Sequence, residues 1–314
     1  MKSINNTITI IAAACMIVSC ASNPYAPTNK VHKKHSKELS KELKILPPPY
    51  PGSASALNVA EDWVGTTNFN LRKPNIVVIH HTAQDSVGQT LKTFTLKRTQ
   101  VSSHYVIGKN GEIYHMLNDL YRAWHGGTGQ WGSNTDLNSS SIGIELDNNG
   151  RDDFSPLQIN SLLELLKDLK EKYKIPAANF IGHSDIAPTR KNDPNKTFPW
   201  EELAKEGFGL WYDEIPETEK LQDLDKGNIL TTEIPQEIKT EVNDSVIVAK
   251  VKAPELIPLL DVTPKVALKV IGYDVSDMPA AIKAFKLHFI QTEVNSTLTD
   301  HDLKVLNNLY KKYL

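Results

Sequence analysis

The sequence predicts an α/β protein with a mixed central β-sheet flanked by helices, followed by a small domain of three helices. Two stretches carry most of this prediction. The apolar run NIVVIHH is typical of a buried strand, and SPLQINSLLELLKDLKEKYKIP is typical of a long amphipathic helix. The segments around them follow the order strand, helix, hairpin, strand, helix, strand, which is the order expected for an α/β sheet.

The first strand is predicted from Asn75 to His81, because this segment is a continuous apolar run that contains two β-branched valines. The next segment, QTLKTFTLKR, has helical spacing at Leu91 and Phe94. SSHYVIGKNGEIYHM predicts a hairpin, because Asn110-Gly111 supplies the positive φ that a tight turn needs. A further strand, SSIGIEL, is predicted from Ser140 to Leu146.

The long helix has a clear predicted start. Ser155 is a good N-cap, Pro156 suits the first turn, and Gln158 would complete a capping box. Its apolar face is predicted to comprise Ile159, Leu162, Leu163, Leu166, Leu169 and Tyr173. NFIGH is then a short strand that leads into the proline-rich loop GHSDIAPTRKNDPNKTFPW.

Three short helices are predicted near the C-terminus, after an acidic stretch interpreted as a linker or insertion with VIVAKV as a stray strand. Thr263-Pro264 would begin the first and Gly272 would end it. Asp277 would cap the second, and Thr299 with Asp302 would form a capping box on the third.

The N-terminus predicts export. MKSINNTITIIAAACMIVSC has a lysine and then an apolar run too short to span a bilayer, as in a secretory signal. Its end, IVSC, resembles the lipobox of bacterial lipoproteins, which implies acylation of Cys20. The alternative is a plain signal peptide cut after a small residue. We therefore predict a signal peptide (1–19), a polar tether (20–55), a catalytic domain (56–213), an acidic linker (214–254) and the helical domain (255–314).

Composition excludes some functions. The 314 residues carry a formal net charge of −2, which gives no basic field for nucleic acid. The two cysteines, Cys15 and Cys20, both fall at the N-terminus, so a metal site must use other ligands.

Two histidines end predicted strands, at His80 and His183, and Asp193 follows in the proline-rich loop. Two imidazoles, a carboxylate and an open position for water form a catalytic zinc site. The HExxH motif is absent, and any single histidine could equally be a packed or surface residue.

Several motifs in fixed order favour a zinc site over packed or surface histidines. They are VIHHTA, SSHYVIGKNGEIYHM, AWHGG, SIGIEL and GHSDIAPTRKNDPNKTFPWEELAKEGFGLW. Together they resemble the zinc-dependent N-acetylmuramoyl-L-alanine amidases of the second amidase family, and among these the outer-membrane lipoprotein amidases. The family also includes peptidoglycan recognition proteins and phage lysozyme-type amidases. The C-terminal helices resemble, more weakly, a small peptidoglycan-binding domain.

The resemblance implies a role for individual residues. It places the zinc ligands at His80, rather than its neighbour His81, and at His183 and Asp193. Glu145 matches the catalytic carboxylate, and Lys191 matches the lysine that stabilises the oxyanion. Histidines at two further family positions, His104 and His125, would be structural or would contact substrate. His115, His288 and His301 are assigned no role.

The expected function is zinc-dependent hydrolysis of the amide between N-acetylmuramic acid and L-alanine in peptidoglycan or muropeptides. The protein would be a monomer, anchored to the outer membrane through lipid and facing the periplasm. The alternatives are a non-catalytic peptidoglycan receptor, which would lack a ligand or Glu145, and a structural lipoprotein that tethers the envelope to the wall.

Overall fold

The computed structural model describes residues 23–45, 66, 71, 73–215, 241–242, 245–246 and 261–314. The chain divides into two compact units, Met1–Phe69 and Asn70–Leu314. In the first unit the described structure is helix α1 (Ala26–Glu42), which has no buried residue. The sequence predicted a polar tether here but not a helix. Within the described residues, no helix combines the length and the apolar character needed to cross a membrane.

The second unit is built on a five-stranded sheet with the order β3-β2-β4-β1-β5. Only the β2–β3 pair is antiparallel; the other three pairs are parallel. This mixed sheet confirms the predicted fold class. The strands are β1 (Ile76–His81), β2 (Tyr105–Ile107), β3 (Ile113–His115), β4 (Ser141–Leu146) and β5 (Phe180–Gly182).

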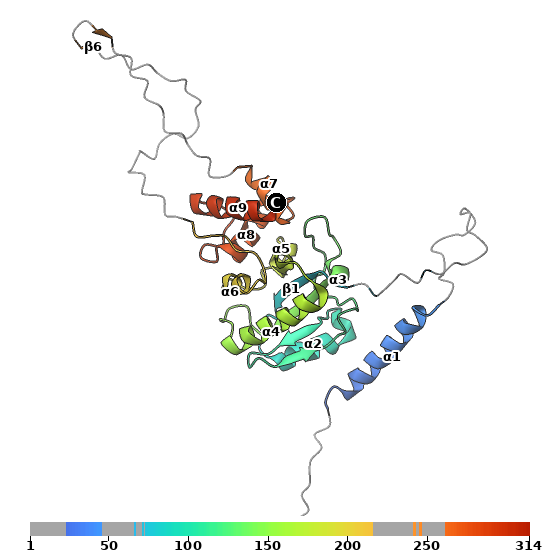
Figure 1. Ribbon diagram of the computed structural model, residues 1–314. Coiled ribbons are helices and arrows are strands. Elements are labelled where there is room, and N and C mark those ends of the chain that lie inside the picture. Colours follow the sequence, from blue (N-terminus) through green and yellow to red (C-terminus); the bar gives the residue numbers. More distant parts are fainter. Residues whose placement is uncertain are drawn as a thin grey trace, which may run out of the picture. The chain divides into compact units, whose positions relative to one another are not determined.

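Helices lie between the strands in the predicted order (Figure 1). Those that precede the proline-rich loop are α2 (Val87–Thr95), η2 (Lys97–Thr99), α3 (Leu137–Ser140), α4 (Pro156–Tyr173) and η3 (Ala177–Asn179). Those that follow β5 are α5 (His183–Ile186), α6 (Trp200–Lys205), α7 (Pro264–Ile271), α8 (Met278–Phe289) and α9 (Asp300–Tyr313). The short strands β6 (Glu241–Val242) and β7 (Ser245–Val246) pair with each other, and the rest of VIVAKV lies outside the described residues.

The sheet has a core on each face. Val77 and Ile79 of β1 belong to the core that includes the apolar side of α4. Ile76 and Val78 belong to the core that includes α5 and the C-terminal helices. Successive strand residues point to opposite faces, so His80 shares a face with Ile76 and Val78. The site described below therefore lies on the side of the C-terminal helices.

The predicted hairpin and the start of α4 are present with one correction. Gly111 has the positive φ expected in the turn, at 83°. Ser155 is the N-cap of α4, but its side chain accepts no capping hydrogen bond, so the predicted capping box with Gln158 is wrong. The amide of Gln158 instead turns to the sheet, where it donates to the carbonyl oxygen of Ile107 at 2.8 Å.

The C-terminal helices begin as predicted. Thr263 accepts a hydrogen bond from the first turn of α7, and Asp277 does the same for α8. Thr299 and Asp302 form the predicted capping box on α9. Asp302 is also paired at 2.8 Å with Lys286, whose side chain is fully buried. This buried pair fixes the start of α9 against α8.

A buried carboxylate joins the sheet to the end of α4. Asp119 accepts hydrogen bonds from the hydroxyls of Tyr105 and Tyr173, each at 2.7 Å, and from Nζ of Lys172 at 2.8 Å. Burial alone would raise the pKa of Asp119, but the bonds from Lys172 and the two tyrosines outweigh it and lower that pKa.

We expect Asp119→Asn to lower the free energy of unfolding by about 1–3 kcal/mol at pH 7, because a charged acceptor of three bonds is lost. A folded pKa below the unfolded one stabilises the fold fully above the unfolded pKa of about 4. That contribution is lost as the pH falls through the folded pKa. Urea denaturation of both proteins at pH 7 and pH 3 should show the difference narrowing at pH 3; an equal difference at both would contradict this role.

Candidate metal centre

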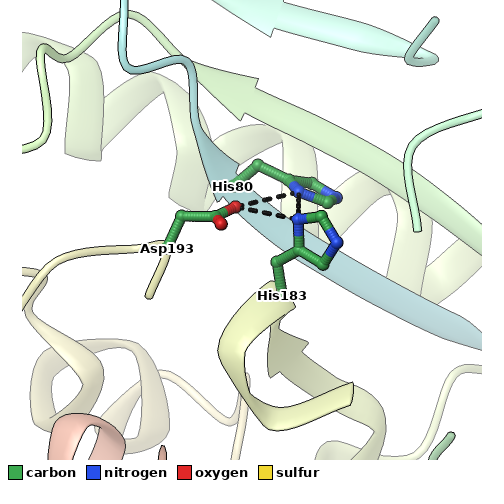
Figure 2. Close-up of side chains that lie close together, drawn as sticks. All are labelled: His80, His183 and Asp193. Carbon is green, nitrogen blue, oxygen red and sulfur yellow. Dashed lines mark hydrogen bonds and ion pairs between the residues drawn. The ribbon is translucent and has the colours of Figure 1, made fainter. Parts of the chain in front are cut away.

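Three buried side chains converge at one end of the sheet: His80, His183 and Asp193 (Figure 2). Nδ1 of His80 lies 2.8 Å from Nδ1 of His183 and 3.1 Å from Oδ2 of Asp193. The third side of this triangle, from His183 Nδ1 to Asp193 Oδ2, is 3.0 Å. This group could bind a metal ion.

Local structure explains why residues so far apart in sequence meet. His80 lies near the end of β1, and His183 begins α5 directly after the neighbouring strand β5. Parallel strands end at the same edge of a sheet, so both imidazoles are delivered to one place. The loop then folds back, because the backbone N–H of Ser184 donates to the carbonyl oxygen of Asp193 at 2.8 Å.

The tautomer of His183 follows from a backbone contact. Its Nε2 lies 3.1 Å from the carbonyl oxygen of Gly126, which can only accept a hydrogen bond. When the ring is neutral, as a metal ligand must be, its proton therefore lies on Nε2. Nδ1, which faces the other two side chains, then carries a lone pair and no hydrogen.

The tautomer of His80 is set by a longer relay. The hydroxyl of Ser141 donates to the carbonyl oxygen of Leu137, so its oxygen accepts from Nε2 of His125 at 3.2 Å. Nδ1 of His125 is then an acceptor, and Nε2 of His80 donates to it at 3.1 Å. Burial lowers the pKa of His80 to about 4 and that of His125 well below its usual value, so both rings are neutral at pH 7. Nδ1 of His80 is thus also without hydrogen.

These assignments decide whether a metal fits. Two imidazole lone pairs and a carboxylate oxygen face one another at 2.8–3.1 Å in a buried site. Such atoms repel one another unless a cation lies between them. Two neutral imidazoles and a carboxylate, with their outer nitrogens held by hydrogen bonds, are a typical zinc ligand set. The residues present therefore fit a divalent metal.

A glycine makes room for the relay. Gly143 lies in β4 between Ser141 and Glu145, and a Cβ atom there would lie 2.4 Å from Cγ of His125. The backbone N–H of Gly143 donates to Nδ1 of His104 at 3.0 Å, and Nε2 of His104 contacts the carbonyl oxygen of Tyr121 at 2.9 Å. Both nitrogens of His104 are thus used by the backbone. The sequence left a structural and a substrate-contacting role open for His104, and these two backbone contacts favour the structural role.

Glu145 lies directly beside the group. It pairs with His80 in the register between β4 and β1, and it is 9% exposed. Burial, with the charge of Asp193 nearby, raises the pKa of Glu145 to about 8, while the charge of Lys191 opposes the shift. A buried carboxyl group with a pKa near neutrality is typical of a catalytic acid or base.

A cavity of about 330 Å³ opens onto these residues. It is lined by His80, His183, Asp193, Glu145, His125 and Lys191, with Trp124, Val101 and Phe94 among the other lining residues. Lys191 lines this cavity and is exposed to solvent. A larger open hollow of about 720 Å³ lies along α4, but it contains none of the predicted site residues.

His81 lies apart from the group, as strand alternation requires. Its Nδ1 accepts a hydrogen bond from the backbone N–H of Asn195 at 3.1 Å, on the other side of β1. It touches the cavity, but it is not a member of the candidate metal group.

The C-terminal helices hold the helix that carries His183. Asp185 is fully buried and accepts hydrogen bonds from the hydroxyl of Tyr273 and from Nδ1 of His288, each at 2.7 Å, and from the backbone N–H of Gly182 at 2.6 Å. The ring of His288 stacks on Trp200 with 3.9 Å between ring centroids. His288 was assigned no role from the sequence, because it lies 103 residues from Asp185 and no sequence pattern links the two.

A mixed sheet whose edge carries two imidazoles, a carboxylate and a buried glutamate is typical of metal-dependent hydrolases. Comparison with known proteins agrees with this class. A family model described as N-acetylmuramoyl-L-alanine amidase matches residues 70–196. The solved structure of the amidase AmiD from Escherichia coli, in complex with an anhydro-N-acetylmuramic acid peptide, has a TM-score of 0.58 at 30% identity. The match covers 79% of this chain and 93% of that chain. This chain therefore belongs to the N-acetylmuramoyl-L-alanine amidase family.

Two curated relatives show how far the sequence match extends. AmiD of Escherichia coli is 42% identical over 154 residues, 44% of this chain and 55% of that protein. The 1,6-anhydro-N-acetylmuramyl-L-alanine amidase AmpD of Haemophilus influenzae is 39% identical over 103 residues, 32% of this chain and 56% of that protein. The chain thus spans about half the length of the curated relatives it matches.

We expect Gly143→Ala to weaken zinc binding by about 10- to 100-fold, because the added methyl group must displace His125 from the relay that orients His80. Overpacking should also lower the free energy of unfolding by about 1–3 kcal/mol. Isothermal titration with zinc and thermal unfolding measure the two effects.

The matched control is Gly88→Ala in α2, where an added Cβ meets nothing within 4 Å. It should leave zinc affinity and stability nearly unchanged. Equal zinc affinities for the two variants would show that His125 does not orient His80.

Proposed function

We propose that this chain is a zinc-dependent N-acetylmuramoyl-L-alanine amidase that hydrolyses the amide between the lactyl group of N-acetylmuramic acid and L-alanine. The observation that carries the proposal is the convergence of His80, His183 and Asp193 beside Glu145 on one face of the sheet. The family membership and the names of the relatives support the reaction type. They do not favour a purely structural role.

His80, His183 and Asp193 would hold the zinc ion through Nδ1, Nδ1 and Oδ2. Zinc in such a site supplies Lewis-acid chemistry, polarising a carbonyl group and making water a better nucleophile. The neutral, hydrogen-free nitrogens are provided by the contacts of His183 with Gly126 and of His80 with His125.

Glu145 is the proposed base and then the proposed acid. Its carboxylate takes a proton from the attacking water as the new C–O bond forms at the amide carbon. It returns the proton to the leaving nitrogen as the C–N bond breaks, so that an acid and an amine are released. A pKa raised to about 8 lies close to the working pH, where proton transfer is most efficient, and it favours the return of the proton to the leaving nitrogen.

Lys191 is the proposed partner of the developing negative charge on the carbonyl oxygen. Its place in the cavity lining and its electrostatic effect on Glu145 support that role. The AmiD structure contains anhydro-N-acetylmuramic acid bearing a short peptide, which makes anhydro-muropeptides the first substrates to test here.

We expect Glu145→Gln to lower kcat by about a hundred- to ten-thousandfold, because general-base catalysis is lost, while zinc content stays near that of the wild type. His80→Ala should lose zinc and activity together, and His81→Ala should lose much less of either. Zinc analysis and mass spectrometry of muropeptide products on the same preparations measure all three. Turnover of Glu145→Gln within a few-fold of the wild type would remove Glu145 as the base, and loss of its zinc would make it a ligand.

We propose also that Cys20 is acylated and anchors the protein to the outer membrane, facing the periplasm. The support is the sequence IVSC at the end of a short apolar run; Cys20 lies outside the described residues. Cys20→Ala should convert a protein that pellets with membranes into a soluble or unprocessed one. A wild-type protein already soluble after cell fractionation would contradict the anchor.

A further inference from the structure

Helix α1 carries a one-sided row of lysines. Within Ala26–Glu42 the lysines recur at intervals of three, one, three and four residues. Residues three and four apart are neighbours on a helix, so this spacing puts all five side chains within an arc of about 100°. We call this row the lysine stripe; it comprises Lys30, Lys33, Lys34, Lys37 and Lys41.

The stripe is exposed and largely uncompensated. All five lysines are exposed, and α1, coloured blue in Figure 1, has no buried residue. Within the described residues the stripe makes one ion pair, between Lys41 and Glu38 at 3.2 Å on the exposed helix surface. An exposed pair of this kind contributes little. The face therefore keeps a strong positive charge.

This arrangement is unfavourable for an isolated helix. Like charges three or four residues apart destabilise a helix, and the stripe contains several such pairs. In proteins most of the stability of a helix comes from packing an amphipathic face and not from intrinsic propensity. The helix also lacks an apolar face to bury. A polyanionic surface would relieve the repulsion and stabilise the helix at the same time.

We propose that the lysine stripe binds the anionic phospholipid surface of a bilayer and lays α1 along it. The choice of a bilayer over another polyanion rests on the proposed lipid anchor. From Cys20 to the first residue of α1 is 26 − 20 = 6 positions, which an extended chain spans in about 20 Å. An anchored chain would hold the stripe near the headgroups, within reach of a field that fades over about 8 Å.

The strength expected from such a surface is measurable. Each lysine near an anionic membrane strengthens binding by about fivefold, so five together give well over a hundredfold. Binding should fall steeply with ionic strength, because the interaction is electrostatic and involves no apolar insertion. Phosphatidylglycerol supplies the negative charge, and phosphatidylcholine is the neutral reference.

The test uses the unacylated polypeptide from Ala21 onward, which keeps every described residue of both units. Its binding should therefore not depend on whether Cys20 is acylated in the cell. It is sedimented with phosphatidylcholine vesicles containing either no phosphatidylglycerol or about a third of it. We expect binding only to the anionic vesicles, loss of binding at high salt, and slower amide exchange of residues 26–42 in their presence.

Two matched variants each remove five positive charges. The stripe variant changes its five lysines to glutamine and should lose at least a hundredfold in vesicle affinity. The control changes five exposed lysines of the second unit to glutamine and should bind as the wild type does; they are Lys92, Lys167, Lys265, Lys269 and Lys283. Muropeptide hydrolysis should be unchanged in both variants. Equal binding to neutral vesicles, equal losses in the two variants, or binding to purified peptidoglycan without binding to anionic vesicles would each overturn the proposal.

Discussion

The site depends on one constraint: two imidazole nitrogens and a carboxylate oxygen must face one point with no proton between them. The fold meets this constraint with hydrogen bonds on the far side of each ring. The carbonyl oxygen of Gly126 accepts the hydrogen bond from Nε2 of His183. On the other ring, Ser141 orients His125, which in turn accepts the hydrogen bond from Nε2 of His80. A group built in this way would be oriented before a metal ion arrived, so less conformational freedom would be lost on binding.

The C-terminal helices are part of that arrangement. Tyr273 and His288 donate hydrogen bonds to the carboxylate of Asp185, which lies in the same short helix as His183. The sequence predicted a catalytic domain and a separate helical domain. In the folded chain these two regions share the core on one face of the sheet. A helix of four residues has little stability of its own, so its position is set by these tertiary contacts.

Sequence patterns predict the parts of this molecule whose cause is local. Strand runs, helix caps and the hairpin glycine were predicted because neighbouring residues determine them, and a glycine inside a strand such as Gly143 is a known signal of close approach. Contacts between distant segments carry no such pattern. Gln158 fits a capping box in sequence, yet in the structure its side-chain amide donates a hydrogen bond to the carbonyl oxygen of Ile107. The relay through Ser141 and the bond from His288 to Asp185 likewise exist only after the sheet has formed.

Strand register explains why the proposed chemistry lies at this edge of the sheet. His80 and Glu145 are direct partners on adjacent parallel strands and share a face, so a change of one position in register would send one of them into the opposite core. The same pairing places Glu145 beside the candidate ligands, where burial raises its pKa. Lys191, by contrast, is exposed on a loop. In the proposed mechanism, Glu145 would act as the base beside the three candidate ligands, and the exposed ammonium group of Lys191 would offset the negative charge that develops on the carbonyl oxygen as the amide is attacked.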